Sequence, residues 1–194
     1  MKRILLMCLV SVFAVIKCSS DVMDPSETEK RMFIALPADT ALGDTTKIDN
    51  YYMIHGSYGT TIQFSRQFTG GPFGQYSISA TLTIDTGTIP ASDSLLCLMS
   101  VYVKNSCVHI SPIEQYYVHP FKLTITYTGL DLQQLDFSNL QFAYSNEKDV
   151  YFNVNYDSII MDYVTGKLEV VNAIVQYDPR QVPDGKYGWV RKSE

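Results

Sequence analysis

One short stretch of the sequence has the residue types for acid–base chemistry. Asp85, Thr86 and Gly87 follow the apolar run TLTI, so the Asp85 carboxylate would lie at the end of a β-strand. Two carboxylates that share a proton can activate water for peptide hydrolysis. The chain has one copy of the tripeptide, so this chemistry would need a homodimer. Asp and Gly are also common in tight turns, which is the alternative interpretation.

The stretch Asp85-Thr86-Gly87-Thr88 resembles the Asp-Thr-Gly loop of aspartic proteases. Residues 127–131, YTGLD, resemble the Gly-x-Asp segment of retropepsin-like domains, but Thr128 stands where those enzymes have an aliphatic strand, and the sequence between the two segments contains no glycine-rich flap. A dimeric aspartic protease that uses Asp85 is therefore the third of three functional hypotheses.

The other residues that could hold a metal or act as a base are scattered. His55, His109 and His119 occur singly, and no loop has the alternating acidic spacing of a calcium site. The sequence predicts no metal site, no cofactor and no catalytic pair of nucleophile and base. It favours a protein that is not an enzyme.

Cys97 and Cys107 are a candidate disulfide, because such bonds form in exported proteins. A turn at residues 104–106 would place Val103, rather than Cys97, opposite Cys107. Two small thiols buried in the core are the alternative.

The N-terminus has the pattern of a secretory signal peptide over residues 1–20. Lys2 and Arg3 precede thirteen residues, 4–16, that contain nothing more polar than serine, and small residues follow. Cys18, with two serines after it, resembles the lipid-attachment site of bacterial lipoproteins, although Lys17 departs from the small residue usual before that cysteine. Lipidation at Cys18 and cleavage near Ser20 remain alternatives. Either predicts an extracytoplasmic location, in the cell envelope, on the outer surface or secreted.

The charge balance limits the class of partner. The formal net charge is −5 at pH 7, and the first twenty residues contain three basic side chains and no acidic one. An acidic mature chain does not favour binding to nucleic acid or to an anionic membrane face. Membrane contact is expected only through a lipid anchor.

Alternating polar and apolar residues predict an all-β fold. Ser77, Ser79, Thr81 and Thr83 alternate with Ile78, Ala80, Leu82 and Ile84. Short strands separated by turn residues favour an antiparallel β-sandwich of ZU5-like or immunoglobulin-like type with little helix. We expect residues 21–50 to form a linker or edge segment and residues 51–194 the sandwich. The predicted strands are 51–55, 61–68, 76–84, 94–103, 121–127, 140–145, 150–156 and 167–177.

Three segments resemble ZU5-like domains of bacterial envelope proteins: TLTIDTGTIP at 81–90, YYVHPFKLTITYTGLDL at 116–132, and TGKLEVVNAIVQY with KYGWV at 165–177 and 186–190. The resemblance implies a sandwich that serves as an extracellular or interaction module. Some relatives cleave themselves at a His-Phe-Ser tripeptide. Here the corresponding residues, 176–179, are QYDP, without the serine or the histidine, so self-cleavage is not expected.

The first hypothesis is therefore a non-catalytic envelope or surface protein with a structural or interaction role. The second is a module that binds a glycan or protein partner through its tyrosines; ordinary cross-strand pairing is the alternative role for these side chains. Their clustering on one exposed face would favour binding. The candidate ligand-binding residues are Tyr51, Tyr52, Tyr58, Tyr116 and Tyr117.

Overall fold

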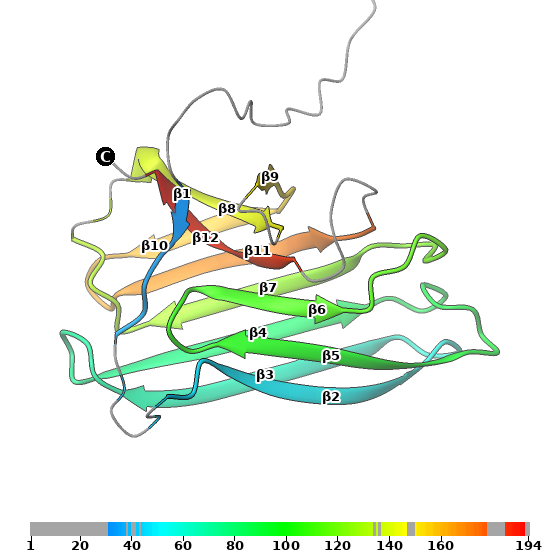
Figure 1. The fold of residues 1–194 in the computed structure, drawn as a ribbon. Helices are drawn as coiled ribbons and strands as arrows, with labels where there is room; N and C mark the ends of the chain where they lie inside the picture. Colours follow the sequence, from blue (N-terminus) through cyan, green and yellow to red (C-terminus); the bar gives the residue numbers. More distant parts are fainter. Residues whose placement is uncertain are drawn as a thin grey trace, which may run out of the picture.

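The structure is a computed structural model, and it describes residues 31–37, 39, 42, 44–133, 135, 137–146, 150–177 and 185–192. Two antiparallel sheets pack face to face (Figure 1), so the predicted all-β sandwich is confirmed. The predicted signal peptide and Cys18 lie outside the described residues. Within the described part of the chain, no helix has the length and apolar character needed to cross a membrane.

The seven-stranded sheet has the order β2-β5-β6-β12-β8-β9, and β1 pairs with β12 outside this path. All the pairs are antiparallel. Its strands are β1 (Arg31–Phe33), β2 (Lys47–His55), β5 (Ser94–Tyr102), β6 (Cys107–Ser111), β8 (Leu140–Ser145), β9 (Tyr151–Asn153) and β12 (Lys186–Lys192).

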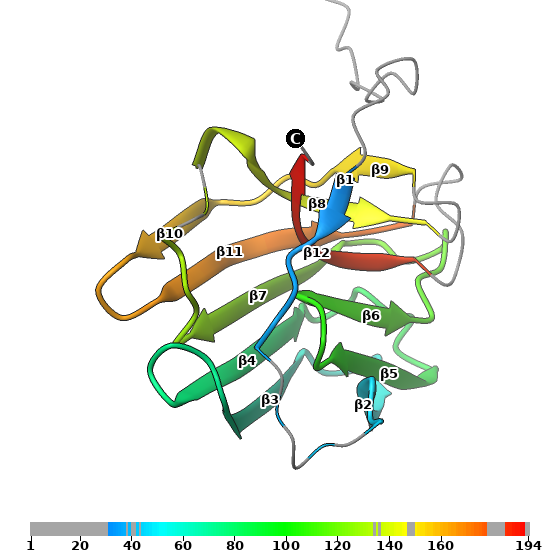
Figure 2. The ribbon, with the colours of Figure 1, turned by 60° about the vertical axis from the view of Figure 1, so that its left-hand side comes forward.

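The five-stranded sheet has the order β10-β11-β7-β4-β3, and Figure 2 shows it as a separate layer against the first sheet. The strands of the five-stranded sheet are β3 (Thr60–Thr69), β4 (Gln75–Ile84), β7 (Phe121–Thr128), β10 (Ser158–Asp162) and β11 (Lys167–Val175). A 3-10 turn, η2 (Phe137–Asn139), precedes β8 of the seven-stranded sheet.

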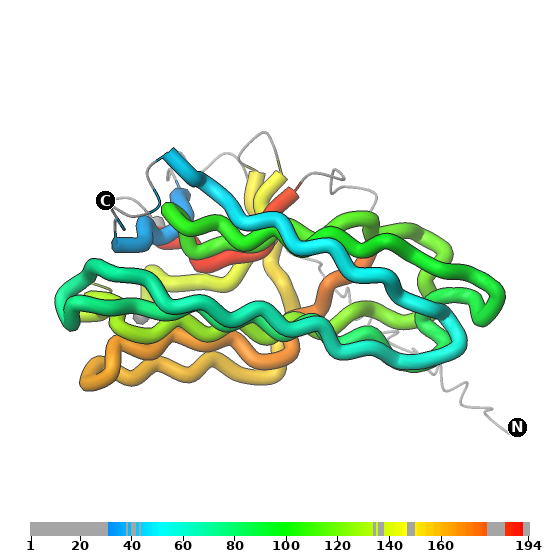
Figure 3. Tube along the Cα trace, turned by 90° about the horizontal axis from the view of Figure 1, so that it is seen from below, coloured from blue at the N-terminus to red at the C-terminus, as the bar shows by residue number. Residues whose placement is uncertain are grey.

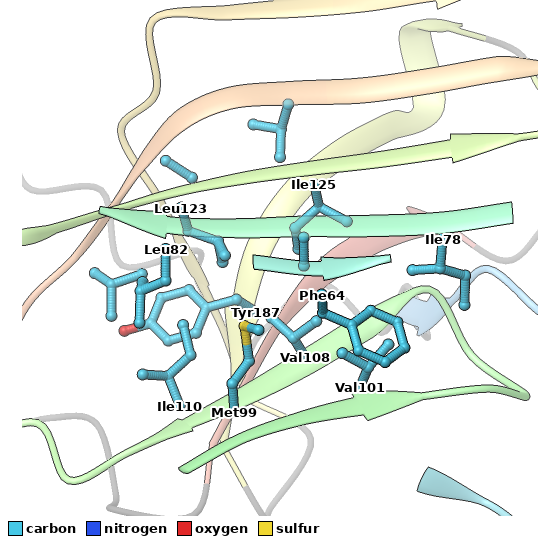
Figure 4. Close-up of a cluster of buried hydrophobic side chains, with 14 of the residues drawn as sticks. Phe64, Ile78, Leu82, Met99, Val101, Val108, Ile110, Leu123, Ile125 and Tyr187 are labelled. Carbon is cyan, nitrogen blue, oxygen red and sulfur yellow. The ribbon is translucent and has the colours of Figure 1, made fainter. Parts of the chain in front are cut away.

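The core lies between the sheets and follows from side-chain alternation. Every second side chain of β7, from Phe121 to Tyr127, is fully buried, and β4 alternates in the same way. Each buried aliphatic side chain contributes about 1.5–3 kcal/mol through the hydrophobic effect. Figure 4 shows Ile78, Leu82, Leu123 and Ile125 from the five-stranded sheet facing Met99, Val101, Val108 and Ile110 from the other sheet.

The segment expected to be a linker or edge segment supplies the short strand β1, which pairs with β12 at the edge of the sheet. β2 begins at Lys47 rather than at residue 51, and β6, β10 and β12 were not predicted. β6 was missed because it is only five residues long, and four of them, including the polar His109, are buried. In β12, position 188 needs a glycine, because a Cβ there would lie 2.3 Å from the Ser106 carbonyl oxygen. This glycine interrupts the alternation of polar and apolar side chains by which a strand is recognised.

The chain crosses from one sheet to the other between β2 and β3. Each is the edge strand of its own sheet, and Figure 3 shows the two strands joined by their loop and diverging toward their other ends. The Tyr52 hydroxyl joins them, because it donates to the Gln63 carbonyl oxygen at 3.2 Å. One long side of the sandwich is therefore made of two edge strands.

Candidate functional site

Loops from both sheets meet at one end of the sandwich, which we call the loop end. It consists of residues 56–59, 85–93, 112–120 and 176–177. Gly56 N donates to the Asp93 carbonyl at 3.0 Å, and Ser57 Oγ donates to the Ala91 carbonyl at 2.9 Å. These bonds hold the β2–β3 loop against the β4–β5 loop.

The β6–β7 loop is held against the same end. Val118 N donates to the Thr88 carbonyl oxygen at 3.1 Å. The Thr88 side chain is fully buried, and its hydroxyl has no hydrogen-bond partner in the part of the chain that the structure describes. The loop end is thus a connected surface made of segments that lie far apart in the sequence.

A pocket of about 150 Å³ opens between the β6–β7 loop and the end of β11. Its lining combines aromatic, amide and ionisable side chains, so it offers both flat apolar faces and hydrogen-bonding groups. The lining residues are Glu114, Gln115, Tyr117, Val118, His119, Pro120, Val175, Gln176 and Tyr177.

Tyr117 of this pocket is anchored to the core and supports the neighbouring Tyr116. Tyr117 stacks on Phe121, with ring centroids 5.3 Å apart, and Tyr116 packs edge-on against Tyr117 at 5.0 Å. The Tyr117 hydroxyl donates to the Pro112 carbonyl at 3.5 Å. Burial, followed by the nearby Tyr116 and Glu114, raises the pKa of Tyr117, so its hydroxyl stays neutral. Tyr116 remains 55% exposed on this fixed support.

The structure divides the predicted tyrosines into two groups. Tyr58, Tyr116 and Tyr117 lie at the loop end, and Tyr58 is 74% exposed. Tyr51 points outward from β2, on the face of the seven-stranded sheet that faces away from the core. Tyr52 is half-buried and bonds to β3. Sequence reasoning missed Tyr177, whose place in the pocket depends on the β6–β7 loop. Its only signal was its position as the last residue of the predicted strand 167–177, whereas β11 ends at Val175.

Asp85 lies in the turn that was the alternative interpretation of its motif. Thr88 N donates to the Asp85 carbonyl at 3.2 Å, and Gly87 has a φ of 79°. The Asp85 carboxylate pairs with Lys122, whose Nζ lies 2.8 Å from Oδ2. Its partner is thus a cation and not the second carboxylate that proton sharing requires.

One serine and one histidine are cross-strand neighbours, which the sequence did not predict. Ser100 on β5 pairs in register with His109 on β6. However, Ser100 Oγ donates to Asp49 Oδ1 at 2.6 Å, and the side chain is fully buried. His109 Nδ1 lies 2.9 Å from the Gly185 carbonyl oxygen, so this nitrogen carries the proton and donates it. In a catalytic triad the serine hydroxyl donates to the histidine, and the histidine donates to the acid. Here Ser100 donates to Asp49 and His109 donates to a backbone carbonyl, so Ser100, His109 and Asp49 do not form a triad.

Histidines and acids do not gather elsewhere in the described part of the chain. His55 Nδ1 bonds to Ser94 Oγ at 2.9 Å, and His119 lies in the β6–β7 loop. Among the described residues, no group of three or more His, Cys, Asp or Glu side chains is placed to hold a metal ion.

The candidate disulfide is not formed, because Cys97 and Cys107 are both free and buried. The register of β5 and β6 aligns Leu98 with Ser111, so Cys107 falls level with Tyr102, five residues from Cys97. At about 3.4 Å per residue, the two cysteines are about 17 Å apart along the sheet. The expected alignment of Val103 with Cys107 was also wrong, by one residue. Burial raises the pKa of each thiol to about 12.

A larger hollow of about 280 Å³ lies at the edge of the seven-stranded sheet, beside β1 and β8. The Arg31 guanidinium, which lines it, already donates to Gln141 Oε1 at 3.1 Å. Tyr156 is the sole aromatic side chain in the described lining. The smaller pocket at the loop end therefore has the stronger combination of aromatic and hydrogen-bonding groups.

Comparison with known proteins finds no match: no protein family, no curated protein and no solved structure is similar to the chain.

Proposed function

We propose that the protein is an exported, non-catalytic interaction module, a sandwich of the ZU5-like or immunoglobulin-like type, that binds a glycan at its loop end. The observation that carries this proposal is the pocket lined by Tyr117 and Tyr177, with the exposed Tyr116 packed edge-on against Tyr117.

Rigid aromatic side chains are suited to binding because they lose little conformational entropy when a ligand arrives. Tyr117 is held by Phe121, and Tyr116 is held by Tyr117. Gln115 and Gln176 add amides that both donate and accept hydrogen bonds, as sugar hydroxyls require. A pocket of about 150 Å³ suits one sugar ring rather than a long chain.

The export half of the proposal rests on the N-terminal sequence. A basic head, an apolar run and small residues precede an acidic mature chain, and Cys18 offers a site for a lipid anchor. Intact-mass analysis of the mature protein tests this half. It distinguishes acylated Cys18, cleavage near Ser20 and a retained Met1, and the last of these would contradict export.

The absence of catalysis is supported by the bonding of the candidate groups. Asp85 pairs with Lys122, and the buried Ser100 hydroxyl donates to Asp49. Neither arrangement supplies an accessible nucleophile together with a base.

A protein partner is the second candidate. Tyr58 and Val118 are 74% and 67% exposed at the loop end, outside or at the rim of the pocket. Apolar and aromatic groups at a rigid end of a sandwich suit a broad contact with another protein.

A glycan library probed with the purified protein tests the main proposal. We expect selective binding by the natural protein and by Tyr163→Ala, since Tyr163 is a half-exposed tyrosine in the β10–β11 turn at the other end. The double variant Tyr116→Ala/Tyr177→Ala should lose it. Equal binding by all three proteins, or no selective binding by any, counts against the proposal.

A further inference from the structure

Within the described part of the chain, β2 pairs with β5 alone and so has an open backbone edge. Bonds at the two ends of this ladder join Thr46 to Val103 and Gly56 to Asp93. Thr46 and Gly56 therefore direct their backbone groups toward β5. Because the register between them is unbroken, the even-numbered residues of β2 do the same. Hydrogen-bonded pairs alternate along an antiparallel ladder, so the N–H and C=O groups of residues 47, 49, 51 and 53 and the N–H of His55 point to the open side. The His55 carbonyl oxygen already accepts from Tyr58 N at 3.1 Å.

The middle of this edge is apolar and exposed. Tyr51 and Met53 are 62% and 58% exposed, and their cross-strand neighbours on β5 are Leu98 and Leu96. Leu96 is itself 54% exposed. Natural sheets usually protect a long edge strand with central charges, proline or a bulge, and residues 50–54 have none of these.

We propose that β2 pairs with β2 of a second copy of this chain, antiparallel and about a two-fold axis at Tyr52. This register sets Tyr51 opposite Met53 of the second copy and Asp49 opposite His55 of the second copy. Each residue with open backbone groups then meets another such residue. The four pairs between residues 49 and 55 would form about six backbone hydrogen bonds, because the His55 carbonyl of each copy already accepts from Tyr58.

The side chains select this register over its neighbours. With the axis at Tyr51, Asp49 would lie opposite Met53 and Lys47 opposite His55 of the second copy. With the axis at Met53, Tyr51 would lie opposite His55 of the second copy. Only the axis at Tyr52 matches an acid with a histidine while it also matches the two exposed apolar side chains.

This self-complementarity is the reason to choose a second copy over an unrelated peptide. Two-fold dimers are the commonest closed assemblies, and the two seven-stranded sheets would become continuous across the interface. The interface lies along the side of the sandwich and does not depend on the function proposed for the loop end. Because β2 runs toward the loop end, antiparallel pairing would point the two loop ends in opposite directions.

The solution mass of the purified protein, measured by light scattering after size exclusion over a range of concentrations, tests this inference. We expect a dimer for the natural protein and a monomer for Met53→Lys, because the new charge faces Tyr51 of the second copy and Met53 is too exposed for its loss to unfold the domain. The matched control is Val164→Lys, an exposed apolar residue in the β10–β11 turn, which should remain a dimer.

Cysteine cross-linking tests the register. A mixture of Tyr51→Cys and Met53→Cys proteins should form a disulfide-linked pair far faster than either variant alone, and Cys97 and Cys107 should not interfere because both are buried. A natural protein that is monomeric at every concentration would overturn the inference. So would a Met53→Lys dimer, or a monomer whose β2 edge accepts only a foreign peptide.

Discussion

The backbone amide of Val118 donates to the carbonyl oxygen of Thr88 across 3.1 Å. This bond ties the loop that carries Tyr116 and Tyr117 to the turn that carries Asp85, although thirty residues separate the two bonded positions. The binding surface proposed for the loop end is therefore formed by tertiary contacts before any ligand arrives, which reduces the entropy lost on binding.

Tyr117→Ala should lower the free energy of unfolding by about 2 kcal/mol, since it removes a half-buried ring that stacks on Phe121. It should also weaken glycan binding, because Tyr116 loses its support. Urea denaturation and a binding titration measure the two effects. Tyr117→Phe keeps the ring and loses only the long hydroxyl bond to Pro112, so it should stay close to the natural protein. Equal losses in both variants would contradict this role for the stack.

Tyr127→Phe should raise the free energy of unfolding by about 1 kcal/mol. The ring is fully buried on β7, and its hydroxyl has no hydrogen-bond partner among the described residues. Replacement removes the cost of burying an unpaired polar group. Tyr76→Phe is the matched control, because the buried Tyr76 hydroxyl donates to the Val103 carbonyl at 3.4 Å. Thermal or urea unfolding should show opposite signs for the two variants, and destabilisation by Tyr127→Phe would show that its hydroxyl has a partner.

Gly129→Ala should destabilise the fold far more than Gly87→Ala. The two glycines have nearly the same φ, 76° and 79°, so the backbone strain of an alanine is similar at both, about 1–2 kcal/mol. At Gly129 a Cβ would lie 2.2 Å from the Gln75 carbonyl oxygen, whereas at Gly87 no described atom beyond the chain neighbours would lie within 4 Å of it. The difference in unfolding free energy between the variants measures the clash alone. Similar losses would mean that residues 75 and 129 can move apart.

The free energy of unfolding should fall as the pH rises from about 9 to about 12. Burial raises the pKa of Cys97 and Cys107 from an ordinary value of 9.0 to about 12, so in this range the folded protein holds protons that the unfolded chain releases. The contribution of the buried, neutral thiols to the free energy of unfolding is complete below pH 9. It is lost as the pH rises through their folded pKa. Buried tyrosines titrate in an overlapping range, so the relevant quantity is the difference from Cys97→Ala/Cys107→Ala. A double variant with an unchanged slope would contradict the assignment to thiols.

The sequence pattern predicted the strands that have one solvent-exposed face and one buried face. β4 and β7 alternate clearly, and both lie where the pattern placed them, with the polar side chains outward. β6 and β12 were harder to find. β6 is only five residues long and buries its polar His109, and β12 is buried on both faces from Tyr187 to Val190. The two cysteines are free and buried, as the alternative to the candidate disulfide held. The predicted turn placed Val103 opposite Cys107, one residue from the observed alignment, because the β5–β6 connection sets the register and the pattern does not fix its length to a single residue.

The candidate site was only partly visible in the sequence. Residue type alone identified Tyr116 and Tyr117, but the same reasoning grouped them with Tyr51, which lies on a different surface. Tyr177 joins the pocket through the packing of the β6–β7 loop against the end of β11. Contacts of this kind join residues about sixty positions apart, and no local pattern encodes them.

The most direct test of the proposed function is an amide chemical-shift titration of the isotopically labelled protein with the glycan that binds best in the library. The account predicts saturable shift changes concentrated in residues 114–118 and 175–177, and their loss in Tyr116→Ala/Tyr177→Ala. Changes concentrated on β2 and β5, or in the hollow beside Arg31, would contradict it, as would a spectrum that no glycan alters.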